Sequence, residues 1–177
     1  MRAQTADQSL EWARETIDTH AVVHHLETPG KISGTRWQVS RIDGCAIELK
    51  ETDHREVPDG IVNRDGVFML DEDKVITWNF NLSSLQPAFV MADTSIHEPH
   101  VKIFAQGDAF HTKTEVVTRA VRHDGSTQST QTWSAADNRR NLTIFFDSPG
   151  ADNKLLVRRL ESDLRDAVGH CVVKASR

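Results

Sequence analysis

Alternation of apolar and polar residues is clearest between residues 76 and 82. Apolar side chains fill every second position of this segment: Ile76, Trp78, Phe80 and Leu82. This two-residue period is typical of a strand that buries one face. Further strands are predicted from β-branched or alternating residues over 22–26, 101–105, 115–122, 126–133 and 142–146. The pattern therefore predicts mostly β structure.

Turn signals divide the remaining β segments. Residues 37–50 predict either one long bent strand or a hairpin, because Asp43 and Gly44 offer a turn or bulge between two alternating runs. Residues 51–73 are the most polar part of the chain and predict a loop with a small exposed hairpin. The pair Asp124-Gly125 predicts the turn of a further hairpin.

Two segments have the three- and four-residue spacing of amphipathic helices. The first, residues 6–20, follows a capping box made by Thr5 and Gln8. The second is predicted to begin at Ser148 as its cap, with Pro149 at the first helical position. Its apolar stripe consists of Leu156, Leu160, Leu164, Ala167, Val168 and Cys171. Because such a stripe needs a partner, we expect this helix to pack against a curved sheet.

These elements predict a single α+β domain over residues 1–177. We expect a curved antiparallel sheet or barrel of seven to eight strands, with an N-terminal helix and a C-terminal amphipathic helix packed against it. A competing fold is a helix-grip sheet wrapped around a long C-terminal helix, which would leave an apolar ligand cavity.

The order of elements over about residues 35–172 resembles a pleckstrin-homology-like barrel, in which a C-terminal helix closes one end of an antiparallel barrel. The resemblance is one of architecture. The phosphoinositide-binding pattern of that family is not matched by Lys31, Arg36 and Arg41, and the tryptophan typical of its helix is absent. The resemblance therefore implies a binding scaffold and no particular ligand.

Composition excludes several classes of function. The 177 residues include 21 Lys and Arg against 26 Asp and Glu, a net charge of -5, so no overall positive charge favours nucleic acid or an anionic membrane. No run of about 18 apolar residues is present to span a bilayer. The first residues lack the apolar core of a signal peptide, which is expected of a cytoplasmic protein, or of an extracytoplasmic one whose export signal has been removed.

Cys45 and Cys171 are the only cysteines, and their separation excludes a CxxC redox pair or a zinc ribbon. Two alternatives stay open: each is a small buried residue in a reducing compartment, or the two form a disulfide in an oxidising one. Cys45 alternates with Ile47 and Leu49, and Cys171 lies on the stripe of the last helix. Both thiols are therefore expected to face the interior.

The common phosphate-binding, catalytic and calcium-binding motifs are absent from the sequence. No cofactor is expected, and the leading hypothesis is a non-catalytic binding or interaction module for a small molecule or a protein. Ligands of such scaffolds bind at strand ends and loops. The residues expected at the binding surface are Trp37, His97, His100, Arg119 and Arg122.

Two other functions are alternatives. His97, Glu98, His100 and His111 supply imidazole and carboxylate ligands, so a metal-dependent enzyme is expected if the fold brings them together. A helix-grip lipid carrier requires an apolar cavity instead. The acidic residues between 51 and 73 lack the spacing of a calcium loop, and His54 among them is interpreted as a surface residue.

Overall fold

The structure is a computed structural model that describes residues 6–28, 31–58, 67–95, 98–122 and 124–175. These residues form two α-helices, nine strands and two short 3-10 helices. In chain order the elements are α1 (Ala6–His20), β1 (Val22–Thr28), β2 (Lys31–Asp43), β3 (Ala46–Pro58), β4 (Val67–Asn81), η1 (Leu82–Ser84), η2 (Pro87–Phe89), β5 (Val90–Asp93), β6 (His100–Phe104), β7 (Phe110–Arg122), β8 (Thr127–Arg139), β9 (Asn141–Phe145) and α2 (Asn153–Ala175).

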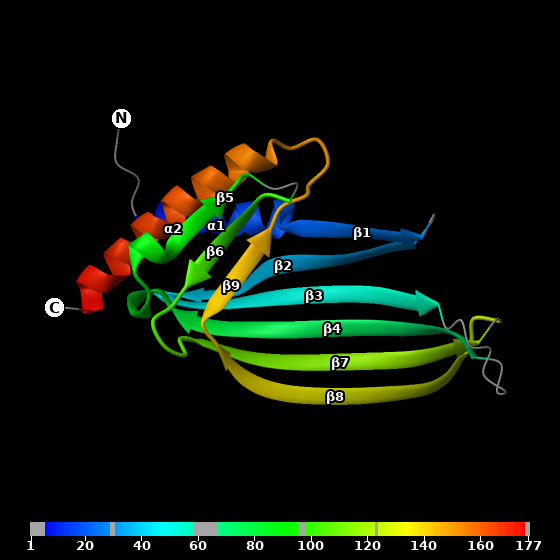
Figure 1. The fold of residues 1–177 in the computed structure, drawn as a ribbon. Coiled ribbons are helices and arrows are strands. Elements are labelled where there is room, and N and C mark those ends of the chain that lie inside the picture. The colour runs from blue at the N-terminus through cyan, green and yellow to red at the C-terminus, as the bar shows by residue number, and fades with distance from the viewer. Residues whose placement is uncertain (1–5, 29–30, 59–66, 96–97, 123, 176–177) are drawn as a thin grey trace.

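The strands form two antiparallel sheets (Figure 1). The larger has six strands in the order β1-β2-β3-β4-β7-β8, and the smaller has three in the order β5-β6-β9. The expected α+β class, with a helix before and a helix after the strands, is confirmed. Among the described residues the large sheet ends at β1 on one side and at β8 on the other. It is therefore an open sheet and not a closed barrel.

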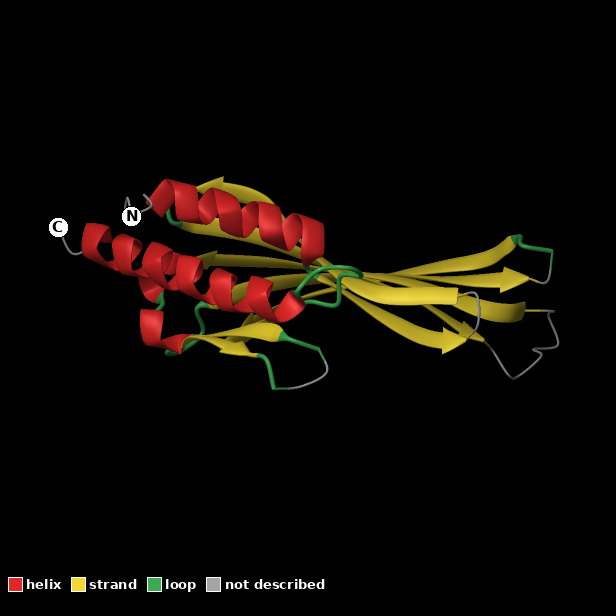
Figure 2. Cartoon of the chain, turned by 90° about the horizontal axis from the view of Figure 1, so that it is seen from above, coloured by secondary structure: helices red, strands yellow, loops and turns green. Residues whose placement is uncertain are grey.

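The helices and the small sheet cover only part of the large sheet. Figure 2 shows both helices and the small sheet gathered at one end of the molecule, with the long strands projecting beyond them. α1 packs on α2 and β2, and α2 also contacts η1, η2, β5 and β6. No helix in the described part of the chain is long and apolar enough to cross a membrane.

One hydrophobic core joins the two sheets and the helices. The large sheet contributes Leu49, Trp78 and Phe110, and the small sheet contributes Val101 and Ile144, all of which are buried. The final helix buries Val157, Leu160, Leu164, Ala167, Val168 and Cys171 in the same core. Packing of its apolar stripe against strands is therefore confirmed, and burial of these apolar side chains is the main stabilising contribution to the fold.

The prediction of a loop and a small hairpin over residues 51–73 is wrong for residues 51–58 and 67–73, and its remaining part, residues 59–66, lies outside the described residues. β3 continues to Pro58, β4 begins at Val67, and the two strands pair without a register shift. Residues of opposite charge are cross-strand partners in this ladder: Asp53 is opposite Lys74, and Arg55 is opposite Glu72. The segment resembles a loop in composition because it lies in the projecting half of the sheet, where apolar residues are not required on either face.

The beginning of the last helix also differs from its prediction. α2 begins at Asn153, and Oδ1 of Asp152 accepts a hydrogen bond from the Leu155 backbone N–H at 3.0 Å. Asp152 is therefore the N-cap in place of Ser148. Gly150 has a φ of +78°, in the left-handed region that glycine enters most readily, so the chain turns before the helix can begin.

Candidate functional site

The two faces of the large sheet carry different side chains. One bears Leu49 and Trp78 and faces the core; we call the other the outer face. Strand alternation places His54 of β3, Asp73 of β4 and Arg119 of β7 on the outer face. His54 is the cross-strand partner of Asp73, and Arg119 is that of Asp71. The register therefore brings these four side chains together.

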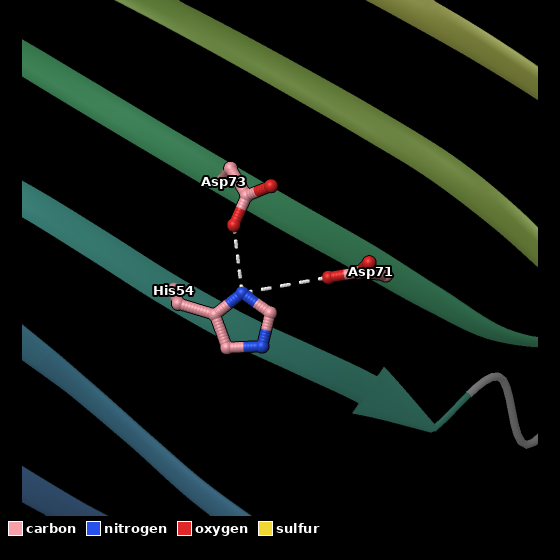
Figure 3. A group of neighbouring side chains, drawn as sticks. All are labelled: His54, Asp71 and Asp73. Atoms are coloured by element: carbon pink, nitrogen blue, oxygen red, sulfur yellow. Dashed lines mark hydrogen bonds and ion pairs between the residues drawn. The ribbon is translucent and has the colours of Figure 1, made fainter.

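They form a network that we call the outer-face charge cluster, of which Figure 3 shows His54, Asp71 and Asp73. Nδ1 of His54 lies 2.7 Å from Oδ1 of Asp73 and 3.5 Å from Oδ1 of Asp71. From the other side, Nη1 of Arg119 donates to Oδ2 of Asp73 at 2.6 Å and lies 3.3 Å from Oδ2 of Asp71. Each carboxylate is thus held between an imidazole and a guanidinium.

The cluster changes the acidity of its members in opposite directions. The hydrogen bond to Asp73 is the main cause that raises the pKa of His54, and the charge of Asp71 adds to it. The pKa of Asp73 is lowered, first by the hydrogen bond from Arg119 and then by that from His54. With His54 protonated, the two positive and two negative charges balance.

His54, Asp71 and Asp73 are also the one group of potential metal ligands that the described part of the chain brings together, with their ligand atoms within 4.8 Å of one another. One imidazole and two carboxylates suit zinc or a related divalent ion. Binding would have to displace the proton of His54, because a metal needs neutral imidazole. Arg119 already binds both carboxylates, so we interpret the cluster as a stabilising ion network.

A hollow of about 500 Å³ lies at the opposite end of the strands, around the β2–β3 turn. We call it the basal hollow. Its residues come from β2, β3, β4, η1, the position before β7, and β7 itself: Arg41, Asp43, Ala46, Ile47, Glu48, Asn79, Phe80, Asn81, Ser84, Ala109 and His111. Polar side chains thus converge around a few apolar ones, which is typical of a small-molecule site.

Hydrogen bonds hold several of these polar groups in place. Nη2 of Arg41 donates to Oδ2 of Asp43 at 2.8 Å. Oε1 of Glu48 accepts from the hydroxyl of Ser40 at 2.6 Å. Nδ1 of His111 donates to Oδ1 of Asn138 at 2.7 Å, which leaves Nε2 of a neutral ring as an acceptor. The charged groups of the hollow are therefore already partnered.

Two residues expected at a binding surface lie in the core. Trp37 and His100 are each 3% exposed, and both pack on Phe145, with ring-centroid distances of 6.0 Å and 5.0 Å. The indole Nε1 of Trp37 and Nε2 of His100 have no hydrogen-bond partner among the described residues. The structure thus brings Trp37 and His100 to one aromatic contact between the two sheets, away from both the charge cluster and the hollow.

The other residues expected at the surface are scattered. Arg119 belongs to the outer-face charge cluster, and Arg122 is exposed at the end of β7. His97 lies outside the described residues. The four described residues therefore do not meet at one surface, and the role of all five in ligand binding stays a prediction.

The predicted metal group is not assembled by its described members. His100 is buried in the small sheet, whereas His111 is exposed on β7 in the large sheet. Glu98, His100 and His111 do not form a group of close ligand atoms within the described ranges.

Of the two alternatives left open for the cysteines, the structure has the disulfide: Cys45 and Cys171 are bonded, with their Cα atoms 5.8 Å apart.

Sequence reasoning missed both the charge cluster and the hollow. The spacing of Asp71 and Asp73, two residues apart, would have indicated one strand face had residues 67–75 been assigned to a strand. For the hollow, Asn79 and Asn81 were visible only as the polar positions of the predicted strand 76–82. No spacing in the sequence connects them to Arg41 or His111, because the sheet register makes that connection.

Comparisons with protein-family models, with curated proteins and with solved structures gave no match for this chain. The geometry of the site is therefore the basis on which a function is inferred.

Proposed function

We propose that this protein is a binding module that holds a small polar ligand in the basal hollow. The observation that supports this is the hollow itself: about 500 Å³ of space in which side chains of several separate elements converge. Small-molecule sites have volumes of roughly 300–1,000 Å³ and combine an apolar surface with a few well-placed polar groups. The strands that supply most of these groups are long and hydrogen-bonded to their neighbours, so the site is rigid.

The chemistry of the lining favours an uncharged ligand rich in hydroxyl groups, such as a short saccharide. Asn79 offers an amide donor and an acceptor, and Asn81 offers its amide NH2, since its Oδ1 already accepts from the backbone N–H and the hydroxyl of Ser83. The hydroxyl of Ser84 donates to the Asn81 carbonyl and keeps its lone pairs as acceptors. Arg41 is paired with Asp43, so the lining does not demand an anionic ligand. Glu48 accepts a hydrogen bond from the hydroxyl of Ser40, and a carboxylate accepts further hydrogen bonds from hydroxyl groups. Ala46 and Ala109 of the lining suit the C–H face of a sugar ring, whereas Phe80 is 8% exposed and packs on Phe110.

The experiment is a panel of mono- and disaccharides tested by saturation-transfer NMR, followed by thermal denaturation. A ligand at 100 times its Kd is expected to stabilise the protein by about 2.7 kcal/mol. Two variants are expected to lose binding: Asn79→Ala removes a polar group, and Ala46→Trp fills the hollow. Thr52→Trp, on the exposed outer face of β3 beyond the hollow, is the matched control and is expected to bind normally.

Two results would contradict the proposal: a panel without a single binder, or a ligand whose binding survives Ala46→Trp.

The alternative function of a lipid carrier has weaker support. A lipid carrier needs a large apolar cavity, whereas the apolar space beneath α1, between Leu10, Ile17 and Phe80, holds about 20 Å³. The proposed site does not depend on the pleckstrin-homology-like resemblance, because it lies on an open sheet.

A further inference from the structure

Among the described strands, the last strand of the large sheet, β8, has a neighbour on one side only. β7 pairs with it from Phe110↔Arg139 to Val121↔Thr127, and no described strand lies beyond it. Every second backbone N–H and C=O of β8 therefore points away from the sheet. Such an edge is a template for a further strand, and proteins usually protect it with charges, prolines, bulges or short length.

β8 lacks most of these protections. Residues 127–136 contain no charged residue, no proline and no glycine, and nearly all their side chains are exposed. Threonine recurs in the stretch, which suits a strand. The ladder with β7 stays in register until the shift between Ala120 and Val121, at the far end of the strand. Between Ser129 and Ala136, β8 is thus a regular and uncharged edge.

The opposite edge of the sheet shows the contrast. β1 is a strand of 7 residues, against 13 in β8. Its pairing with β2 is irregular between His25 and Thr28. A short and irregular edge accepts another strand poorly, so the two ends of the same sheet are not equivalent.

We infer that β8 is a self-association edge, where two copies of this chain join antiparallel β8 strands about a two-fold axis and form one continuous sheet. The absence of charge from residues 127–136 is the reason for choosing a second copy as the partner, because a two-fold contact there brings no like charges together. Each chain carries a net charge of -5, which opposes contact between copies over most of the surface. The uncharged stretch of β8 is a place where that repulsion is small, and a two-fold contact pairs it with itself.

Trp133 supports this arrangement. It lies near the middle of the uncharged stretch and is 58% exposed, a large apolar surface to leave in water. In an antiparallel pair centred on Thr132, the two copies of Trp133 lie on the same face as diagonal neighbours. Pairing would therefore bury part of both indoles as well as satisfy the backbone groups of the edge.

Sedimentation equilibrium across a concentration series tests the inference. Wild-type protein is expected to be a monomer–dimer system. Thr132→Lys and Gln131→Lys place a positive charge near its own symmetry mate, on opposite faces of the strand, and each is expected to raise the dimer Kd roughly tenfold or more. Gln106→Lys adds the same charge at an exposed position in the connection between β6 and β7 and is expected to leave the Kd unchanged.

Circular dichroism of the two β8 variants is expected to match wild type, since both positions are exposed. Trp133 fluorescence, isolated by comparison with Trp133→Phe, is expected to shift to shorter wavelength as the dimer forms. A wild-type protein that stays monomeric overturns the inference. It does so even if a peptide of another sequence binds β8, because the inference is that a second copy of this chain binds there. A dimer that persists in both Lys variants overturns it as well, because its interface lies elsewhere.

Discussion

The indole Nε1 of Trp78 donates a hydrogen bond to Oε2 of Glu51 on the neighbouring strand, at 3.0 Å. On the ring of Trp78, the guanidinium carbon of Arg139 lies 4.9 Å from the centroid. Both partners surround a tryptophan that is only 3% exposed. A carboxylate thus lies at the margin of the core, where the covered half of the sheet meets the projecting half.

Burial raises the pKa of Glu51, against the smaller opposing effect of the Trp78 hydrogen bond. A carboxyl whose pKa is raised in the folded protein favours folding below its ordinary value of 4.5, and this contribution is lost as the pH rises through the folded pKa. We expect Glu51→Gln to be at least as stable as wild type near neutral pH, with the advantage disappearing at about pH 4.

Urea denaturation at both pH values measures the difference between the two proteins. Glu115→Gln is the matched control, because Glu115 is exposed on the outer face of β7. Trp78→Phe removes the donor and leaves the carboxylate without it, at a cost of about 1–3 kcal/mol in addition to the cost of the volume lost from the core. A Glu51→Gln advantage that grows on acidification would contradict a raised pKa of Glu51.

His54 is expected to stabilise the fold in a defined pH window. Its raised pKa contributes stability that is fully present below its ordinary value of 6.5 and is lost as the pH rises through the folded value. The lowered pKa of Asp73 contributes above its ordinary value of 3.8 and is lost on further acidification. The outer-face charge cluster therefore stabilises the fold most between pH 3.8 and pH 6.5.

Accordingly, His54→Gln is expected to destabilise the protein more at about pH 5.5 than at about pH 8.5. Denaturation of both proteins at the two pH values checks this, and an NMR titration of His54 checks the direction of its pKa. His111→Gln, which removes a histidine bonded to the uncharged amide of Asn138, is the matched control. An equal effect of His54→Gln at both pH values would count against the ion network.

The same cluster gives a prediction about metals. Because its charges balance without an ion, one equivalent of zinc is expected to leave the melting temperature unchanged near neutral pH. Differential scanning calorimetry with and without zinc measures this. A stoichiometric stabilisation that disappears in His54→Gln would show that His54, Asp71 and Asp73 bind a metal after all.

Asp163 interrupts the buried stripe of α2. The residue is 5% exposed, its Oδ2 lacks a hydrogen-bond partner in the described structure, and Nε of Arg159 is 3.7 Å from that oxygen. Burial is the main cause that raises the pKa of this carboxyl. Asp163→Asn removes the buried charge at nearly constant shape, so we expect higher stability near pH 7 and a smaller gain in acid.

Thermal denaturation over pH measures the effect of Asp163→Asn. Glu11→Gln, an exposed position on α1, serves as its control and is expected to change stability little. A clear loss of stability in Asp163→Asn at neutral pH would show that the charged form of Asp163 is required.

The disulfide between Cys45 and Cys171 spans 126 residues of sequence. Closing so long a loop in the unfolded chain stabilises the fold by about 4–5 kcal/mol in the chain-entropy model. Reduction, or Cys45→Ser with Cys171→Ser, is expected to lower the free energy of unfolding by about that amount. Denaturation with and without reductant measures it. Two titratable thiols in unreduced, denatured protein would contradict the bond.

The sequence determined the local elements where burial enforces a period. Ile76, Trp78 and Phe80 had to alternate because one face of β4 meets the core, and the stripe of α2 had to be apolar because it packs against strands. The same reasoning failed over residues 51–58 and 67–73. In the projecting half of the sheet the polar composition of a loop and that of a solvated strand are alike, so the period vanishes.

Which residues meet was decided only by the tertiary structure. Register places His54 opposite Asp73 and Asp71 opposite Arg119, and packing of α2 on η1 places Cys171 beside Cys45. The sequence offered Trp37 and His100 as surface residues, although both lie in the core against Phe145. The period of apolar residues along a strand indicates which of its faces is buried. Pairing between distant strands depends on contacts that no local pattern encodes.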